Sequence, residues 1–401
     1  MSTKQKTTSR VPTLRFKEFT NEWEIHKIGE FVYERTEYAN DDLSLYSLTI
    51  ENGITPKSER YERSFLITTD NESYKAVNPN DFAFNPMNLR FGAIARHRGS
   101  DKVKVSKYYN IFAVNDKANP VFLEYYFKLY QMIVFYNRMA TGSLIEKQRV
   151  HFLDFIKFLK PFPSKEEQNK IAEFFSSIDA LIDNFKNQKS ELEIFRRGII
   201  QAIFSQAIRF KKNNSENYND WETKRLGALF NERNIKNGEK EHRLLSVKIH
   251  GGVVPQGDTN KADNSNSDKS KYKVVRVGDI AYNTMRMWQG ASGVSQYEGI
   301  VSPAYTVVYP KNGDANFYGY LFKHPRTIFN FYRYSQGLTS DTWNLKFQHF
   351  SEVEVTVPSD LEEQKKIAAF LSSLDELIEQ KKKQIALAEQ WKKGLLQQMF
   401  V

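Results

Sequence analysis

Two short stretches of the chain come close to the residue types and spacing of catalytic motifs. Asn85–Asn88 is the nearest approach to the N-P-P-aromatic motif of adenine methyltransferases, but it lacks the second proline and the stacking ring. Glu363–Lys365 has the E-x-K spacing of many nucleases. No suitable carboxylate on a preceding strand accompanies it, so we expect a solvated helix face there. Neither stretch predicts a working active site.

Other sequence signatures of catalysis are missing as well. The chain has no G-x-x-x-x-G-K-[ST] phosphate loop, no G-x-G-x-x-G opening a helix and no G-x-S-x-G elbow. Its 7 His residues are scattered and it has 0 Cys, which excludes disulfides, thiolate zinc sites and a Cys nucleophile. We therefore expect no metal site, no cofactor on this chain and no catalytic activity of its own. An unrecognised active site remains an alternative.

The charge balance favours an acidic partner. The 401 residues contain 58 Lys and Arg against 48 Asp and Glu, a net charge of +10 with a pI near 9.3. No apolar run is long enough to span a membrane, and the polar, basic start predicts no signal peptide. We expect a cytoplasmic protein that binds nucleic acid and no membrane.

Basic side chains alternate with aromatic and amide side chains in two comparable stretches, each after an Asp-x-Ala-x-Asn sequence. Lys and Arg suit phosphates, and Arg, Asn, Gln, Ser and Thr suit base edges. For any one of these residues the alternative is a solvated loop. The candidate DNA-binding residues are Arg90, Arg96, Arg98, Lys102, Lys147, Arg149, Lys248, Arg286, Trp288, Gln289, Thr339 and Ser340. Arg35 and Arg233, which match each other, are either similar contacts or fold-supporting ion pairs.

An internal duplication organises these elements. Residues 166–204 and 362–400 align without a gap and are identical at nearly half of their positions. The match continues more weakly outside them, through Trp23-Glu24 with Trp221-Glu222 and Asp81–Asn85 with Asp279–Asn283. Each repeat is therefore a variable segment followed by a well-matched segment.

The well-matched segments have the apolar spacing of long coiled-coil helices. At 1.5 Å per residue each helix is about 58 Å long. One helix is the obvious partner of the other. Because an internal repeat folded back on itself gives a pseudo-two-fold arrangement, we expect them to pack antiparallel. The predicted packing residues are Ile171, Phe174, Ile178, Leu181, Phe185, Leu192, Phe195 and Ile199 in the first helix, and Ile367, Phe370, Leu374, Leu377, Trp391 and Leu395 in the second.

The variable segments alternate short β-type runs with helical stretches near 120–139 and 316–334. The predicted fold class is α+β: two similar mixed α/β domains separated by an antiparallel coiled coil of two long helices, in a pseudo-two-fold internal repeat. The predicted boundaries are 1–162 and 207–357 for the domains, and 163–206 and 358–401 for the spacer helices.

Over its whole length the chain resembles the specificity (S) subunits of type I restriction–modification systems. The resemblance is carried by the order domain, helix, domain, helix and by the Pro-Ser…Glu-Glu-Gln-x-Lys-Ile-Ala start of each helix. It implies that each variable domain is a target recognition domain for one half of a bipartite DNA site. It also implies that the helices set the spacing and dock two modification (methyltransferase) subunits, which bind S-adenosylmethionine, and that restriction (translocase–nuclease) subunits can join.

Because the two domains differ in sequence, we expect the bipartite site to be asymmetric, with a fixed spacer. The alternative functions are a coiled-coil scaffold with incidental basic loops and a general DNA-binding protein. On the leading hypothesis, Arg96→Glu or Arg286→Glu impairs DNA binding and leaves assembly intact.

Overall fold

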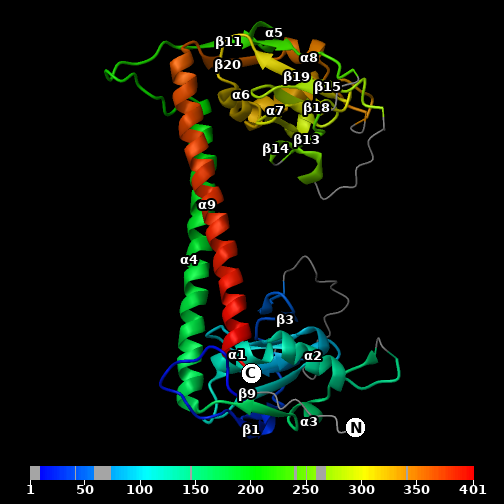
Figure 1. Ribbon diagram of the computed structural model, residues 1–401, viewed down its shortest axis with the longest axis vertical. Helices are drawn as coiled ribbons and strands as arrows, with labels where there is room; N and C mark the ends of the chain where they lie inside the picture. Colours follow the sequence, from blue (N-terminus) through cyan, green and yellow to red (C-terminus); the bar gives the residue numbers. More distant parts are fainter. Residues whose placement is uncertain are drawn as a thin grey trace. The chain divides into compact units, whose positions relative to one another are not determined.

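The structure is a computed structural model that describes residues 10–40, 42–57, 74–144, 147–238, 242–249, 251–258, 268–339 and 342–401. The chain forms two compact units (Figure 1). Unit 1 contains Met1–Lys186 and Lys383–Val401, and unit 2 contains Asn187–Lys382. Each unit therefore takes part of its sequence from both long helices.

Unit 1 is a mixed α/β unit. Its strands are β1 (Glu24–Lys27), β2 (Val32–Arg35), β3 (Tyr46–Thr49), β4 (Gly53–Pro56), β5 (Tyr74–Val77), β6 (Phe82–Phe84), β7 (Ile94–Arg96), β8 (Val103–Ser106), β9 (Asn110–Val114) and β10 (Leu159–Phe162). Its short helices are α1 (Pro120–Phe127), α2 (Tyr130–Met139) and α3 (Phe152–Phe155). The side chain of Asn119 caps α1 by accepting hydrogen bonds from the backbone N–H groups of Val121 and Phe122.

Unit 2 repeats this order of strands and helices, and has the short helix α5 where unit 1 has a 3-10 turn at Ile28–Glu30. Its strands are β11 (Trp221–Arg225), β12 (Phe230–Glu232), β13 (Leu245–Lys248), β14 (Gly252–Pro255), β15 (Lys273–Val275), β16 (Ile280–Asn283), β17 (Ser292–Val294), β18 (Gly299–Val301), β19 (Tyr305–Pro310) and β20 (Glu354–Pro358). Its short helices are α5 (Leu226–Leu229), α6 (Ala315–Leu321), α7 (Pro325–Tyr334) and α8 (Phe347–Glu352).

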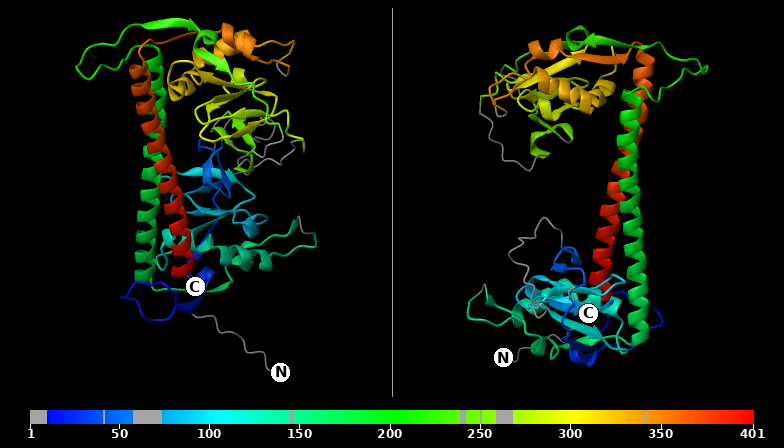
Figure 2. Two further views of the ribbon diagram at one scale, coloured as in Figure 1. Left: turned by 45° about the horizontal axis from the view of Figure 1, so that its top comes forward. Right: turned by 180° about the vertical axis from the view of Figure 1, so that it is seen from behind.

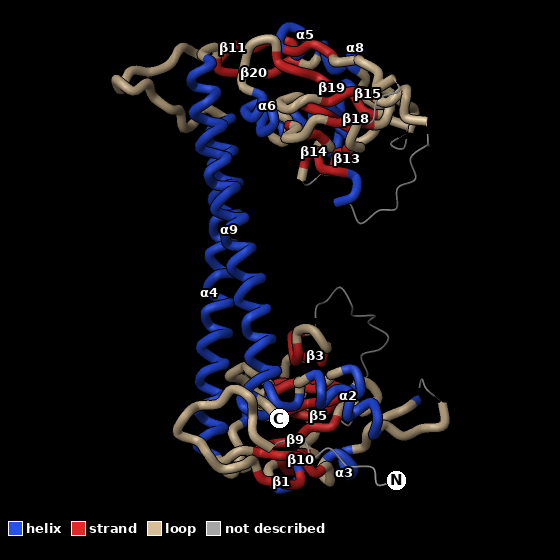
Figure 3. Tube along the Cα trace, in the orientation of Figure 1, coloured by secondary structure: helices blue, strands red, loops and turns tan. Residues whose placement is uncertain are grey.

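The two units share one sheet topology. Each has an antiparallel four-stranded sheet, with strand order β2-β9-β6-β7 in unit 1 and β12-β19-β16-β17 in unit 2. In both sheets an interior strand begins directly after the Asp of the Asp-x-Ala pattern: Phe82 lies opposite Phe112, and Ile280 opposite Val308. A two-stranded ribbon joins the start of each domain to its end, β1 with β10 and β11 with β20 (Figure 3). The predicted α+β class with a duplicated mixed domain is confirmed.

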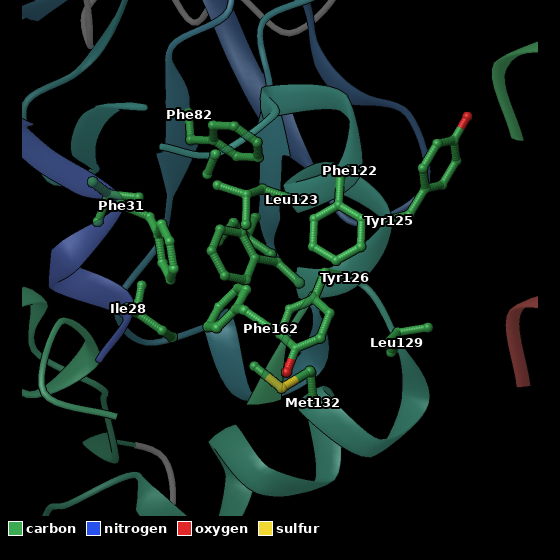
Figure 4. Close-up of a cluster of buried hydrophobic side chains, with 14 of the residues drawn as sticks. Ile28, Phe31, Phe82, Phe122, Leu123, Tyr125, Tyr126, Leu129, Met132 and Phe162 are labelled. Carbon is green, nitrogen blue, oxygen red and sulfur yellow. The ribbon is translucent and has the colours of Figure 1, made fainter. Parts of the chain in front are cut away.

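Aromatic rings fill the core of unit 1 (Figure 4). Phe82 stacks on Phe112 with ring centroids 5.1 Å apart, and Phe162 packs between Phe31 at 4.5 Å and Tyr126 at 4.9 Å. Fully burying a side chain of this size contributes about 1.5–3 kcal/mol. The rigid core fixes the strand ends from which the loops of unit 1 project.

The two predicted long helices are present as α4 (Lys165–Phe204) and α9 (Leu361–Met399). In unit 1 the first half of α4 runs antiparallel to the last part of α9 (Figures 1 and 2). Phe175 and Phe400 have ring centroids 6.0 Å apart, and further along α4 the ammonium of Lys186 lies 2.8 Å from the carboxylate of Glu389. The antiparallel arrangement is therefore observed within this unit.

One interhelix ion pair is built in both units. In unit 1 Asp179 of α4 pairs with Lys392 of α9, and in unit 2 Asp375 of α9 pairs with Arg196 of α4. Each Asp also accepts a hydrogen bond of 2.7 Å from a tyrosine of the adjoining domain, Tyr125 or Tyr320. The internal duplication therefore preserves the same contacts between the two helices and the adjoining domain in both units.

The seam of these helices differs from the predicted one in its second register. Ile171 and Ile178 are buried as expected, but the residues buried between them lie four positions on, not three. This second register contains Phe175 and Ile182 on α4 and Leu371 and Ile378 on α9. The +4 flank is buried because it also meets the domain core, where Phe175 packs 5.2 Å from Tyr125.

Four predicted packing residues are therefore on the wrong flank. Leu181 and Phe195 of α4 are 41% and 51% exposed, and Leu377 and Trp391 of α9 are 44% and 52% exposed. The other predicted residues are buried or half-buried, namely Ile171, Phe174, Ile178, Phe185, Leu192, Ile199, Ile367, Phe370, Leu374 and Leu395.

The Glu-Gln pair at the start of each helix is buried, so the expectation of a solvated face at Glu363–Lys365 is wrong for its first two residues. The Glu363 carboxylate accepts hydrogen bonds from Arg209, and the matching Glu167 accepts them from Arg15. Gln364 donates to the carbonyl of Pro358. These contacts hold the helix start against its own domain.

Candidate nucleic-acid interface

A turn follows the central strand of each unit and is built the same way twice. The side-chain oxygens of Asn85 and Asn283 accept hydrogen bonds of 3.0 Å from the backbone N–H groups of Met87 and Met285. A 3-10 turn follows, at Leu89–Phe91 in unit 1 and at Met287–Gln289 in unit 2. Asn85 therefore shapes a turn, which accounts for the methyltransferase-like stretch without any chemistry.

Glycine closes each of these turns because the backbone there is left-handed. Gly92 and Gly290 have φ of +93° and +80°, and a Cβ on either would lie 3.1 or 3.0 Å from Ile133 or Ile328. These isoleucines belong to α2 and α7. In each unit the helix therefore packs directly against the turn and fixes its position.

A hairpin-like loop returns beside each turn. Thr141 and Arg149 exchange two backbone hydrogen bonds of 2.9 Å, and Gln336 and Asn344 exchange bonds of 2.9 and 2.8 Å. The next residue fastens the loop to the turn. Val150 N–H donates to the carbonyl of Pro86 at 3.0 Å, and Leu345 N–H donates to that of Thr284 at 2.8 Å. Loops far apart in sequence thus meet in each unit.

We name these assemblies by their described residues. Site 1 comprises 85–92 with 141–144 and 147–150, and site 2 comprises 283–290 with 336–339 and 342–345. Seven of the predicted DNA-binding residues lie in them, which are Arg90, Lys147 and Arg149 in site 1 and Arg286, Trp288, Gln289 and Thr339 in site 2. Ser340 lies outside the described residues.

The two sites carry different side chains. In site 1 the Arg90 guanidinium donates to the amide oxygen of Gln148 at 2.9 Å and lies 4.5 Å from the centroid of the Phe91 ring. In site 2 Trp288 packs edge-on against Trp343 with centroids 5.3 Å apart. Lys147, Arg149, Arg286 and Thr339 are exposed around these pairs.

A half-buried lysine supports site 2. The ammonium of Lys323 donates to the carbonyls of Gly290 and Ile249. Burial lowers the pKa of Lys323 to about 8. Lys128 occupies the matching position in unit 1, where burial also lowers its pKa.

Four predicted residues lie elsewhere and have partners within the protein. Arg96 and Arg98 both bind the buried carboxylate of Glu124, at 3.0 and 2.8 Å. Lys102 pairs with Glu37, and Lys248 donates to the carbonyl of Asp258 at 3.3 Å. Arg96 is mostly buried in its ion pair with Glu124 and so has a structural role, while its contact with DNA stays a prediction.

The alternatives for Arg35 and Arg233 are resolved in favour of ion pairs. Arg233 binds both carboxylate oxygens of the buried Asp279, at 2.6 and 2.9 Å, and Arg35 binds the matching Asp81 at 3.1 Å. The same carboxylates also accept backbone N–H groups, from Arg276 and Asn78. These pairs shape the loop that enters the central strand.

Within the part of the chain that the structure describes, no group of three or more His, Asp or Glu side chains is placed to hold a metal ion. In the same residues no helix has the length and apolarity needed to cross a membrane.

Sequence reasoning did not single out Gln148, Trp343 and Tyr332. Tyr332 packs on Trp343 with centroids 4.9 Å apart. The sequence signal for Gln148 and Trp343 was weak, because the two hairpin-like loops share only one residue, Gly142 with Gly337, and both glycines have a φ near +150°. Aligning those loops pairs Gln148 with Trp343.

Comparison with protein families gives a direct match. Residues 218–390, most of which lie in unit 2, match the family described as type I restriction modification DNA specificity domain. Over 138 residues the chain is 32% identical to the Type I restriction enzyme MjaIX specificity subunit of Methanocaldococcus jannaschii. That match covers 32% of this chain and spans only 31% of the archaeal protein.

Among solved structures, the type I restriction-modification system S subunit from M. genitalium superimposes with a TM-score of 0.58. The superposition covers 98% of this chain and 99% of the other, at 15% sequence identity. It shows a shared fold along the whole chain, including the half that the family match leaves out.

Proposed function

We propose that this chain, whose residues 218–390 match the type I restriction modification DNA specificity family, is the DNA-recognition subunit of such a complex. Unit 1 reads one half of a bipartite site and unit 2 reads the other. The observation that carries the proposal is the turn–hairpin scaffold, which is built twice with the same backbone hydrogen bonds and with different side chains. One scaffold with two surfaces suits two different half-sites on double-stranded DNA.

The boundaries that we propose for the recognition domains are 1–162 and 207–357. The ribbons β1–β10 and β11–β20 support them, because each closes a domain just before a long helix begins. We propose that the paired helices of 163–206 and 358–401 set the spacing of the half-sites.

Exposed apolar side chains on the helices suit protein partners. In unit 1 Leu181 and Trp391 are exposed and lie within two residues, along the sequence, of the Asp179–Lys392 ion pair. In unit 2 the matching Leu377 and Phe195 are exposed and lie equally close in sequence to the Asp375–Arg196 pair. We call these two pairs of residues the helix patches. Exposed apolar surface of this kind marks interaction sites. Because the patches match each other, they suit two copies of one partner.

That partner is the methyltransferase subunit, one copy on each patch. It binds S-adenosylmethionine and transfers the methyl group, so the chain itself catalyses nothing. Restriction (translocase–nuclease) subunits join the same complex, and the whole acts in the cytoplasm.

Methylome sequencing tests this function. The chain is co-expressed with its methyltransferase subunit in a methylation-free host, and methylated bases are mapped across the genome. We expect one asymmetric bipartite motif with a fixed spacer, and no methylation when either subunit is left out. Methyl transfer by the isolated chain, or a continuous motif without a spacer, would contradict the proposal.

A further inference from the structure

Sites 1 and 2 differ at one matched pair of positions. Arg90 and Trp288 are each the middle residue of the 3-10 turn, and Gln148 and Trp343 each lie two residues before the backbone bond that fastens the loop to the turn. In both sites the two side chains touch across the gap between turn and loop. The position is therefore conserved in space between the units and different in chemistry.

Site 1 offers an oriented hydrogen-bonding group. Arg90 spends one donor on the amide oxygen of Gln148 and stacks its guanidinium over the exposed Phe91 ring. These two contacts fix the plane of the guanidinium, and a fixed fork loses little entropy when it binds. A guanidinium fork pairs with O6 and N7 of guanine, the most frequent specific contact in the major groove.

Site 2 offers apolar ring surface in the same place. Trp288 already donates its indole N–H to the carbonyl of Met285 at 3.0 Å, so that donor is occupied within the protein. Tyr332 packs on Trp343, and Phe329 stacks on Tyr332 with centroids 6.1 Å apart. Tyr332 and Phe329 are 42% and 58% exposed. A surface of ring carbons suits the 5-methyl group of thymine, the apolar feature of the major groove.

We propose that this matched pair selects the base at one position of each half-site: guanine through Arg90 and Gln148, and thymine through Trp288 and Trp343. The inference rests on the proposed function, which it deepens by naming the base-reading residues. Arg90 contacts the base, and Gln148 is a positioning residue that holds its guanidinium. In site 2 the rings of Trp343, Tyr332 and Phe329 pack one on the next and hold the Trp288 ring in position.

The test is a conversion experiment on the assembled complex. Trp288→Arg together with Trp343→Gln gives site 2 the pair of site 1, and the methylome of the complex is compared with that of the wild type. We expect one position of one half-site to change from thymine to guanine, with the other half-site and the spacer unchanged. A bidentate contact is worth about 1–3 kcal/mol, so methylation of the original site should fall roughly 5- to 150-fold.

Two milder variants cover the case in which the converted site 2 does not fold. Arg90→Lys keeps the charge and loses the fork, so we expect relaxed choice at the guanine and an unchanged salt dependence of binding. Gln148→Glu draws the guanidinium into an ion pair, and we expect the same relaxation. As a matched control, Lys147→Gln in site 1 should weaken binding of all sequences alike and flatten the salt dependence.

The outcomes separate the two proposals. If the wild-type complex gives no bipartite motif, the function itself is wrong. If it gives one, and Arg90→Lys and the converted site 2 assemble but keep the wild-type motif at every position, this inference is overturned and the function stands.

Discussion

The Arg209 guanidinium binds both carboxylate oxygens of Glu363, at 3.2 and 3.0 Å, and the Glu363 side chain is fully buried. Arg15 and Glu167 make the same pair in unit 1, with both contacts at 2.7 Å. In each case a residue outside the domain's sheets is fastened to the first turn of a long helix. Phe16 and Phe210, the next residues, pack on Phe174 and Phe370.

Removing Arg209 should therefore destabilise unit 2. Arg209→Ala leaves a buried carboxylate without its charged partner, which costs about 3–5 kcal/mol in unfolding free energy. Urea unfolding measures the loss. Arg225→Ala is the control, because Arg225 and Glu354 form an exposed pair at 3.6 Å, worth less than about 1 kcal/mol. If Arg209→Ala and Arg225→Ala lost the same unfolding free energy, the Arg209–Glu363 pair would not be the stabilising contact described.

Charge reversal separates Arg96 from Arg286. Arg96→Glu puts a second carboxylate beside the buried Glu124, so the unfolding free energy should fall by about 3 kcal/mol, since Arg98 still pairs with Glu124. Arg286 is exposed, so Arg286→Glu should leave stability within about 0.5 kcal/mol and weaken DNA binding by the complex. Denaturation and DNA titration are measured on the same samples. Arg96→Glu, unlike Arg286→Glu, is therefore expected to impair folding as well as DNA binding.

The helix seam can be checked by truncating residues on its two flanks. Leu371 is fully buried, and Leu371→Ala should cost about 2–5 kcal/mol. Leu377→Ala, on the exposed flank, should cost less than about 0.5 kcal/mol. Thermal or urea unfolding measures both losses. A larger loss for Leu377→Ala than for Leu371→Ala would support the +3 register that the sequence predicted.

The helix patches should control subunit number. Leu181→Asp with Trp391→Asp charges the patch of unit 1 without burying charge, so the variant chain should unfold like the wild type. Native mass spectrometry should show one methyltransferase subunit in place of two. Glu173→Ala on an exposed polar position of α4 is the control and should keep both. Two bound subunits on the doubly charged variant would place the docking surface elsewhere.

Lys323 makes the free energy of unfolding depend on pH in the alkaline range. Its pKa is lowered by burial to about 8 in the folded chain and is about 10.4 in an unfolded one. Between these values the unfolded chain binds more protons, so the contribution of Lys323 to unfolding free energy rises as the pH rises from about 8 to about 10. Below pH 8 the half-buried ammonium lowers the free energy of unfolding.

Lys323→Met should remove the part of that rise that Lys323 contributes, in urea unfolding series from pH 7 to pH 10. The parts contributed by Lys160 and Lys128, whose pKa values burial also lowers, should remain. Lys311→Met is the matched control, because Lys311 also donates to a backbone carbonyl, that of Gly227, but at an exposed position. It should keep the wild-type profile. An unchanged profile for Lys323→Met would assign the pH dependence to another group.

Duplication made the coarse fold predictable. The two long helices, the two mixed domains and the equivalence of the Asn85 and Asn283 turns follow from aligning the chain with itself. The seam register did not follow, because positions +3 and +4 both flank an apolar stripe on a 3.6-residue helix. The domain core selects between them through Tyr125 and Phe175.

The sites were predictable only in part, for a similar reason. Arg90 and Trp288 could be named from local composition. Arg96 binds Glu124 only because α1 packs against β7. Gln148 accepts a hydrogen bond from Arg90 only because the chain returns to the turn after α2. Such partners lie across tertiary contacts, which leave no periodic trace in the sequence.

The aromatic ring of Phe400 packs against Trp23, Phe122, Tyr126 and Phe175. Unit 1 thus incorporates residues that a ribosome makes after all of unit 2, whose matching residue, Phe204, is already available when Trp221 emerges. Synthesis should therefore complete the second half of the protein before the first. Until α9 leaves the ribosome, the apolar surface of unit 1 that Phe400 later covers stays exposed. In that interval unit 1 should depend most on chaperones.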